Sequence, residues 1–290
     1  MRSVVLSNGL LKLTAVPDFG GALATFQRLG RRPTSIFRSA TLEGNLSSNV
    51  DPNDFALYVL VPWSNRIAGG FEYRGQWHAL ANNHPDDYPI HGYGWLAPWT
   101  VDRHSKTRLD LRHEHHGQVF DYISTLTYML EGNTLLIDLS VCNLGSQPMP
   151  YGLGLHPWLP RDADTSLHAN ASGVWLETVD HLSGTHTALP NDWDFNSGRP
   201  LPTTWTNNAF SGWNGQATIC WPARQLELHI QASEIEYFIL YTPVSQGVFC
   251  FEPVTHPVNA HNLRQPQACP GLRILEPGGH TAIHVSFEVD

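Results

Sequence analysis

A chain of 290 residues with a formal net charge of −9 lacks the basic surface that nucleic acids need, so we expect no nucleic-acid partner. Its hydrophobic share of 41% is enough for a substantial core, and no apolar run approaches the roughly 20 residues that cross a membrane. We therefore expect no membrane association and a single domain over residues 1–290. The first apolar stretch ends at Ser7-Asn8-Gly9, too soon for a signal peptide, which predicts a cytoplasmic location.

Strand patterns occur along the whole chain. A hairpin is predicted around Glu131-Gly132-Asn133, because apolar and polar residues alternate over 126–130 and again over 135–141. The same period-two pattern returns over 226–231 and 283–289 and is typical of strands with one solvent-facing side. Residues 162–210 are rich in Asn, Asp, Gly and Thr, and we expect long loops there.

The fold class follows from the short strand segments and the turn residues between them. No long stretch has helical periodicity with caps, and 24 Gly and 21 Pro divide the chain into short segments. The absence of an internal repeat argues against a propeller or a solenoid. The sequence predicts an all-β protein with antiparallel sheets packed face to face in a large sandwich.

Two features raise the question of a metal site. His113 and His115 would share one face of a strand, but no third ligand is spaced to complete a site, and the stretch resembles the wet end of a strand. We therefore predict no metal, and no phosphate-binding, dinucleotide or nucleophile-elbow motif indicates a cofactor. Four cysteines form no Cys-x-x-Cys pair, so we expect buried thiols: Cys142, Cys220, Cys250 and Cys269.

Four segments place a polar group of catalytic or hydrogen-bonding type beside turn residues or bulky apolar neighbours: 62–67, 89–92, 154–158 and 249–253. In the last, Glu252 follows an apolar run and precedes Pro253, which interrupts strand pairing on its donor side. Partial desolvation there would raise the pKa of the carboxyl and make it a better base. The alternative is a Glu that only accepts a structural hydrogen bond.

The other segments offer a proton donor and polar contacts. His156 is held between a Gly-rich approach and Pro157, and a rigid His suits proton transfer, although it could equally be a satisfied core group. Asn65-Arg66 joins an amide to a planar cation, which suits vicinal hydroxyls or a carboxylate; the alternative is a salt-bridged loop arginine. Ten tryptophans could include faces for stacking on a sugar, although most tryptophans lie in cores.

Together the four segments occur in the order and approximate separation seen in the aldose 1-epimerase (galactose mutarotase) family, which the chain resembles over nearly its whole length. Asn65-Arg66-Ile67 looks like the family's Asn-Arg segment, and His91-Gly92 looks like its His-Gly. Residues 150–158 resemble the approach to its His-Pro-aromatic motif, and 251–255 resemble the segment that carries its catalytic Glu.

The resemblance implies a galactose mutarotase-like supersandwich with an open sugar cleft, no cofactor, and a monomeric or homodimeric state. It implies that the chain interconverts the α and β anomers of a free hexose. Glu252 would take the proton of the C1 hydroxyl and His156 would give one to the ring oxygen. The substrate-binding residues would be Asn65, Arg66, His91, Trp158 and Asn207.

One position departs from the family. Where a sugar-binding Asp usually precedes a Phe by three positions, this chain has Asn207 before Phe210. An amide donates and accepts hydrogen bonds but lacks the charge-assisted bond of a carboxylate. We therefore expect a substrate preference different from plain galactose.

Three other functions remain open on the sequence. A hexose-6-phosphate mutarotase would need a second basic residue beside Arg66 to hold a dianion. A non-catalytic carbohydrate-binding protein of the same fold would have no use for an acid–base pair. A glycoside hydrolase would need a second carboxylate, and none is obvious among Asp192, Asp194 and Glu276.

Overall fold

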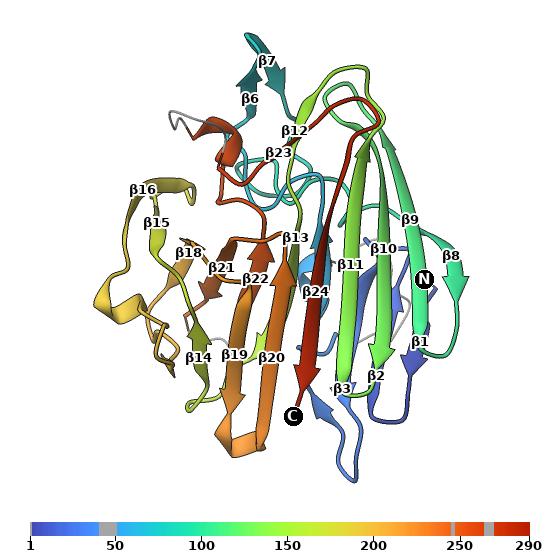
Figure 1. The fold of residues 1–290 in the computed structure, drawn as a ribbon, viewed down its shortest axis with the longest axis vertical. Helices are drawn as coiled ribbons and strands as arrows, with labels where there is room; N and C mark the ends of the chain where they lie inside the picture. The colour runs from blue at the N-terminus through green and yellow to red at the C-terminus, as the bar shows by residue number, and fades with distance from the viewer. Residues whose placement is uncertain (1, 41–50, 245–246, 264–269) are drawn as a thin grey trace.

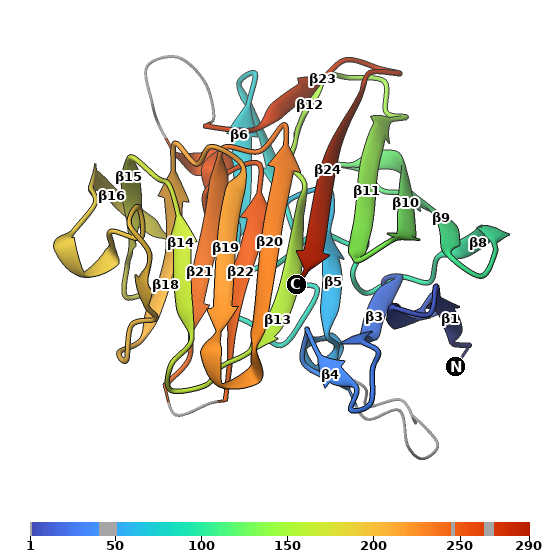
Figure 2. The same ribbon diagram turned by 60° about the horizontal axis from the view of Figure 1, so that its bottom comes forward.

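The computed structural model describes residues 2–40, 51–244, 247–263 and 270–290. Two large antiparallel sheets pack face to face, as Figure 1 and Figure 2 show from two directions. The described residues contain no α-helix and only four 3-10 helices: η1 (Pro52–Asp54), η2 (Asn191–Trp193), η3 (Pro222–Arg224) and η4 (Ala260–Asn262). The predicted all-β sandwich is confirmed.

No helix in the described part of the chain is long and apolar enough to span a membrane.

The larger sheet has 11 strands in the order β1-β2-β3-β5-β13-β22-β21-β18-β15-β16, with β4 paired to β3. Chain neighbours pair at its edges, whereas its centre joins strands from distant parts of the sequence. Its strands are β1 (Val4–Ser7), β2 (Leu11–Val16), β3 (Ala22–Arg28), β4 (Thr34–Ser35), β5 (Leu57–Leu60), β13 (Gly154–Pro160), β15 (Gly173–Glu177), β16 (Ser183–Ala188), β18 (Thr206–Ser211), β21 (Tyr237–Thr242) and β22 (Val248–Val254).

The second sheet has nine strands in the order β17-β14-β19-β20-β24-β11-β10-β9-β8. They are β8 (Thr100–His104), β9 (Arg108–His116), β10 (Asp121–Glu131), β11 (Thr134–Asn143), β14 (Ser166–Ala169), β17 (Arg199–Pro200), β19 (Gln216–Trp221), β20 (Leu226–Ser233) and β24 (His280–Val289). Two small ribbons complete the fold: β6 (Gly70–Tyr73) with β7 (Gln76–Ala79), and β12 (Met149–Tyr151) with β23 (Arg273–Leu275).

The strands with the clearest sequence patterns form as predicted. β10 and β11 make a hairpin in which Leu126 faces Leu139 and Tyr128 faces Ile137, so one side of the ribbon is apolar. β20 and β24 cover the other two alternating segments and pair with each other. In each of these strands, alternate residues are buried, as a sheet with one face on the core requires.

Alternation also decides where polar side chains gather on the larger sheet. In β13 and β22, the odd-numbered residues such as Leu155 and Phe251 enter the core between the sheets. Even-numbered neighbours, including Trp158 and Cys250, belong to a second cluster on the opposite face. His156 and Glu252 are also even-numbered, so they lie on this outer face, away from the nine-stranded sheet.

One local expectation is wrong, and a second holds only in part. Residues 162–210 do not form long loops; they hold the short strands β14 to β18 and η2, because their Asn, Asp and Gly residues serve many tight turns. The wet strand end predicted for the stretch around His113 and His115 holds for the exposed Glu114 and His116 but not for His113. His113 is 7% exposed, and its ring packs 5.4 Å from that of Trp99, since its alternation places it on the inner face with Leu111.

The cysteines are less buried than predicted. Cys250 is buried, but Cys142 and Cys220 are only half-buried, and all three are free thiols. Both half-buried cysteines occupy positions in β11 and β19 that alternate with core residues, so strand periodicity prevails over the preference of Cys for interiors. Cys269 lies outside the described residues.

Candidate functional site

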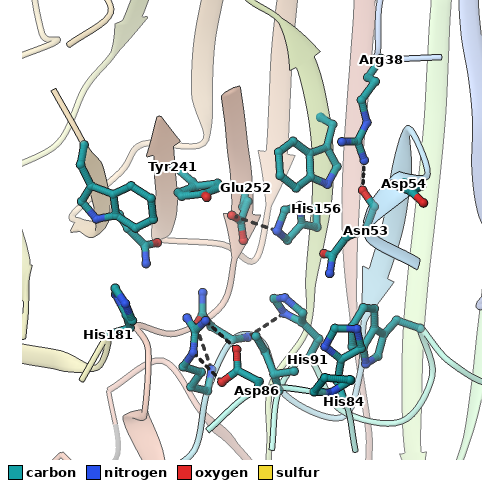
Figure 3. Close-up of a pocket in the computed structure, with 18 residues that line it drawn as sticks. Arg38, Asn53, Asp54, His84, Asp86, His91, His156, His181, Tyr241 and Glu252 are labelled. Carbon is teal, nitrogen blue, oxygen red and sulfur yellow. Dashed lines mark hydrogen bonds and ion pairs between the residues drawn. The ribbon is translucent and has the colours of Figure 1, made fainter. Parts of the chain in front are cut away.

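A cavity of about 440 Å³ opens on the outer face of the larger sheet, and Figure 3 shows the 18 side chains around it. Strands β13, β18, β21 and β22 form its floor, and the segments that carry residues 38, 53–54, 65–66 and 84–95 add further lining residues. The structure brings all seven predicted site residues to this cavity, while their roles stay predictions: Asn65, Arg66, His91, His156, Trp158, Asn207 and Glu252.

Sheet register places His156 opposite Glu252. Gly154 pairs with Val254 and Trp158 pairs with Cys250, so counting inward from either pair brings His156 and Glu252 to the same level of adjacent strands. Their Nε2 and Oε1 atoms are 3.3 Å apart, and Figure 3 shows the two side chains meeting in the cavity. Two residues 96 positions apart in the chain therefore form one cross-strand pair.

Pro157 and Pro253 lie in the interval where no ladder pairs join β13 to β22. Because neither proline has an N–H, the two strands cannot complete their hydrogen bonding there. The predicted interruption at Pro253 thus exists on the β13 side. On its other side β22 continues to Val254, since Phe238 of β21 pairs with Pro253.

Burial governs the protonation of the pair. Glu252 is 1% and His156 is 5% exposed. Desolvation raises the pKa of the Glu252 carboxyl well above its usual range, with a smaller opposing effect from Arg66. Desolvation also lowers the pKa of His156 to about 3, and the charge of Arg38 adds to this.

The pair therefore favours a protonated Glu252 beside a neutral His156, whereas the proton transfers that the family resemblance implies start from an ionised Glu252 and a protonated His156. Whether the shared proton lies on Glu252 (both groups neutral) or on His156 (carboxylate and imidazolium), the pair has no net charge. Glu252 Oε2 and His156 Nδ1 are buried and have no hydrogen-bond partner among the described residues. A ligand that reaches these atoms would remove the cost of leaving them unpaired.

Aromatic rings hold His156 in place. Its ring stacks on Tyr58 with centroids 4.5 Å apart and lies 5.4 Å from the ring of Trp158. The Tyr58 hydroxyl donates to Asn53 Oδ1 at 2.8 Å, which fixes the stacking partner in turn. The guanidinium of Arg38 lies 4.2 Å above the Trp158 ring and donates to the carbonyl oxygen of Phe55 at 2.7 Å.

Asn65 and His91 come from two loops that bond to each other. Both residues have left-handed backbone conformations, with φ of 53° and 60°. The Asn65 N–H donates to His91 Nδ1 at 3.2 Å, and the His91 N–H donates to the Asn65 carbonyl at 3.0 Å. Since Nδ1 accepts and burial lowers the pKa of His91 well below its usual value, this ring is neutral and carries its proton on Nε2.

The turn at His91-Gly92 also requires a close approach. Gly92 has a φ of 73°, and a β-carbon at this position would lie 2.0 Å from the carbonyl oxygen of Val61. Only glycine permits this approach to Val61, which follows β5. The Gly92 turn therefore fixes the position of His91 next to the end of that strand.

Arg66 is a salt-bridged residue, as the alternative interpretation held. Its Nε and Nη2 atoms donate to the two carboxylate oxygens of Asp86 at 2.9 and 2.7 Å. Asp86 also lines the cavity, and Arg66 holds the pKa of its carboxyl below the usual value. The cavity therefore gains a rigid planar group, but its charge is already balanced.

Asn207 is tied to a carboxylate that does not line the cavity. Its Nδ2 donates to Glu177 Oε1 at 2.6 Å, and Trp205 Nε1 donates to Glu177 Oε2 at 2.6 Å. Trp205 does line the cavity, and three of the ten tryptophans do so in all, together with Trp95 and Trp158.

Nine further lining residues were not predicted from the sequence: Arg38, Asn53, Asp54, His84, Asp86, Trp95, His181, Trp205 and Tyr241. All nine lie outside the four segments, and nothing in their spacing links them to those segments. For Tyr241 a signal existed, because it alternates with core residues in β21 and so belongs to the outer face.

His256 supports the site from behind. It is fully buried, its Nε2 accepts the N–H of Ser64 at 3.1 Å, and its Nδ1 donates to the carbonyl of Pro257 at 2.8 Å. Both ring nitrogens are thus used by the neutral form, and desolvation lowers the pKa of His256 to about 4. The segment that carries Asn65 is anchored through this ring.

We expect this buried histidine to make the fold sensitive to acid. The pKa of His256 is depressed in the folded state, so the unfolded chain binds more protons between pH 6.5 and 4 and the free energy of unfolding falls as the pH drops. The loss reaches roughly 3 kcal/mol at the lower end. Urea unfolding at pH 7 and pH 4 measures it.

The matched variants are His256→Gln and His104→Gln, the second at an exposed position in β8. The first variant should be less stable than the parent at pH 7 and should lose less stability on acidification. An unchanged pH dependence in His256→Gln would show that other groups control acid unfolding.

A possible metal-ligand group overlaps the pair. Among the described residues, ligand atoms of His156, Cys250 and Glu252 lie within 4.8 Å of one another. Burial raises the pKa of the Cys250 thiol well above its usual value, which disfavours the thiolate that a metal would need. His113 and His115, the pair considered from the sequence, are not in this group.

Comparison with known proteins adds to this geometry. The family model described as aldose 1-epimerase matches residues 2–288. The chain is 34% identical over 301 aligned positions to the uncharacterized protein YphB of Escherichia coli K12, covering 100% of this chain and 99% of that protein. A solved structure from the same organism, named as a candidate aldose 1-epimerase, is 32% identical, with a TM-score of 0.91 and coverage of 100% and 99%.

A galactose mutarotase-like protein from Clostridium acetobutylicum has a TM-score of 0.86 at 19% identity, with coverage of 99% of this chain and 95% of that chain. At this identity the likeness shows the fold.

Proposed function

The chain belongs to the aldose 1-epimerase family, and on this premise we propose that it interconverts the α and β anomers of a free hexose by acid–base opening and closure of the ring. The observation that carries the proposal is the cross-strand pair of His156 and Glu252, 3.3 Å apart, at the floor of the cavity. Each offers a polar atom without a partner among the described residues.

The reaction needs one proton acceptor and one proton donor. In ring opening, the proton of the C1 hydroxyl leaves, the C1–O5 bond breaks, and the ring oxygen gains a proton. We assign the first transfer to Glu252 and the second to His156. After rotation about C1–C2, the same two transfers run in reverse and close the ring in the other anomer.

A pair that shares one proton suits this exchange. Ring opening and ring closure use the two groups in opposite directions, so each must serve as acid in one half and as base in the other. Burial favours the proton on Glu252 before a sugar binds, whereas the charge of Arg66 favours the ionised carboxylate. Movement of the proton to His156 leaves the pair neutral and gives the assignment above.

The remaining lining residues would hold the sugar. His91 offers a donor at Nε2, and Asn65 and Arg66 form a rigid polar wall beside it. Trp158 offers an aromatic face for the C–H side of the ring, next to His156. Asn207 would contact a hydroxyl from β18, which β21 and β22 separate from the strand of His156.

Charge balance favours a free sugar over a phosphosugar. Two arginines among the described residues line the cavity, but Arg66 is paired with Asp86, and Asp54, which also lines the cavity, has a charge that acts on Arg38 to raise its pKa. A phosphate dianion usually needs a cluster of unpaired basic groups. Hexose-6-phosphate mutarotase and non-catalytic carbohydrate binding are therefore the alternatives that a test must separate.

We expect the protein to accelerate anomer exchange of one or more free aldohexoses, with a preference that differs from plain galactose, and to leave 6-phosphorylated hexoses near the uncatalysed rate. NMR exchange spectroscopy in dilute buffer across paired free and 6-phosphorylated sugars measures this. Acceleration confined to the phosphorylated sugars would replace the proposal by the phosphosugar mutarotase. Saturable binding with no acceleration of any sugar would favour a carbohydrate-binding protein.

A further inference from the structure

Glu177, at the end of β15, accepts hydrogen bonds from three side chains that line the cavity. Its Oε1 atom is 2.6 Å from Asn207 Nδ2 and 2.6 Å from His181 Nδ1, and its Oε2 is 2.6 Å from Trp205 Nε1. The Glu177 side chain is 13% exposed and does not itself line the cavity. One carboxylate therefore joins two parts of the cavity wall, the segment that carries Trp205 and Asn207 and the turn after β15 that carries His181.

The backbone of Glu177 is held as well. Its N–H donates to Asn208 Oδ1 at 2.7 Å, where the pairing of β15 with β18 has ended and the register of β15 with β16 shifts. Adjacent residues of β18, Asn207 and Asn208, thus bind the side chain and the main chain of the same glutamate. This double attachment fixes the carboxylate relative to the cavity floor.

The carboxylate determines how Asn207 presents its amide. An ionised carboxylate only accepts hydrogen bonds, so the NH₂ group of Asn207 must face Glu177. The amide oxygen Oδ1 is then the end of the side chain that points away from Glu177. Asn207 therefore presents a hydrogen-bond acceptor to the cavity, as a carboxylate would. The negative charge belongs to Glu177, which lies behind Asn207 and does not line the cavity.

Trp205 is fixed in the same way. It is 42% exposed, an unusual degree for an indole, yet its N–H is bound to Glu177 and its ring meets Tyr241 edge to face at 5.2 Å. A side chain with both its polar atom and its edge held has little rotamer freedom left to lose when a ligand binds. Its exposed surface can serve as a preformed wall.

We propose that Glu177 is a positioning residue that sets the sugar affinity and specificity of the cavity by holding Trp205 and His181 and by orienting Asn207 with Oδ1 toward the substrate. This inference rests on the proposed function. The substrate then carries a hydroxyl that donates to Asn207, and a sugar without a hydroxyl at that carbon binds more weakly.

Exchange of the amide and the carboxylate between the two positions tests the proposal. Glu177→Gln offers an NH₂ group to one of three donors, so we expect KM for the preferred hexose to rise about tenfold or more with kcat within a few-fold of the parent. Asn207→Asp places two carboxylates in contact, and we expect at least the same rise in KM. The double variant again pairs one amide with one carboxylate, and KM should return to within a few-fold of the parent value.

Glu234→Gln is the matched control, because this glutamate is exposed and pairs with Arg273 away from the cavity. Thermal unfolding of all variants separates loss of folding from loss of affinity. If a single substitution raised KM by misfolding the protein, adding the second substitution would not restore KM. Additive defects without recovery, or a fall in kcat at unchanged KM, would overturn the positioning role.

Affinity measured by quenching of tryptophan fluorescence distinguishes this failure from failure of the proposed function. If the parent protein binds hexoses without accelerating anomer exchange, the catalytic proposal fails. The Kd series of the same four variants then supports or overturns the role of Glu177 by the same pattern of loss and recovery.

Discussion

Glu252→Gln lowers anomer exchange by about 100-fold or more at neutral pH, the largest loss that we expect from a single substitution. The amide has nearly the shape of the carboxyl but neither takes nor gives a proton on the time scale of the reaction. Because Glu252 is 1% exposed and lies 3.3 Å from His156, no water-borne carboxylate can replace it at the same point. Polarimetry or NMR saturation transfer on the preferred hexose measures the effect.

The substitution should leave the fold intact. A protonated Glu252 is already neutral in the buried pair, so an amide introduces no new charge to desolvate. Glu131→Gln, at the exposed end of β10, is the matched control and should exchange anomers at the parent rate. A rate within a few-fold of the parent for Glu252→Gln would remove this residue from the mechanism.

His156→Asn is expected to cause a loss of similar size, about 100-fold or more, because it removes the second proton-transfer group. It also removes the ring that stacks on Tyr58, and part of the loss could then come from a shifted wall. His156→Phe retains an aromatic ring in this stack and still has no proton to transfer. The two variants together separate chemistry from packing.

If proton transfer is the role of His156, both variants lose the rate while His156→Phe keeps the greater thermal stability. His280→Asn, at the exposed start of β24, is the control for a histidine outside the cavity. Recovery of exchange in His156→Phe would show that the ring acts by packing, and the assignment of acid and base would have to be abandoned. Combining His156→Asn with Glu252→Gln should cost little more than either alone, since the two act as a unit.

Local patterns were sufficient for much of the fold. The alternation around Glu131-Gly132-Asn133 identified the β10–β11 hairpin, and similar runs identified β20 and β24, because one buried face imposes a period of two on any such strand. The same reasoning failed for residues 162–210. Strands of two to six residues are too short to display a period, so their turn residues were taken for long loops.

The catalytic candidates were identified from a family resemblance carried by short motifs. The sequence could not show that His156 and Glu252 are direct cross-strand neighbours, because the register of β13 against β22 is a tertiary property. The sequence indicated that desolvation raises the pKa of Glu252, but it could not show how completely the surrounding chain excludes water from the pair. That exclusion raises the pKa of Glu252 and lowers the pKa of His156, so the proton is favoured on the carboxyl.

The supporting residues were beyond reach of the sequence. Asp86 neutralises the charge of Arg66, His256 anchors the segment that carries Asn65, and Glu177 holds Asn207. None of these three supporting residues belongs to a recognisable sequence motif. His256 reaches its distant segment through one hydrogen bond, Asp86 through two, and Glu177 through three. Such contacts produce no periodic pattern in the sequence.

By itself the sequence determined the all-β class, the strands with a clear period of two, and the segments that resemble the family's motifs. Those properties are local, since they depend on residues a few positions apart. Only the tertiary structure decided that seven residues from several strands and loops share one cavity, that its charges are nearly balanced, and that Glu177 lies behind it. Hydrogen bonding across the sheet and the exclusion of water act between residues brought together by folding, so neither can be read along the chain.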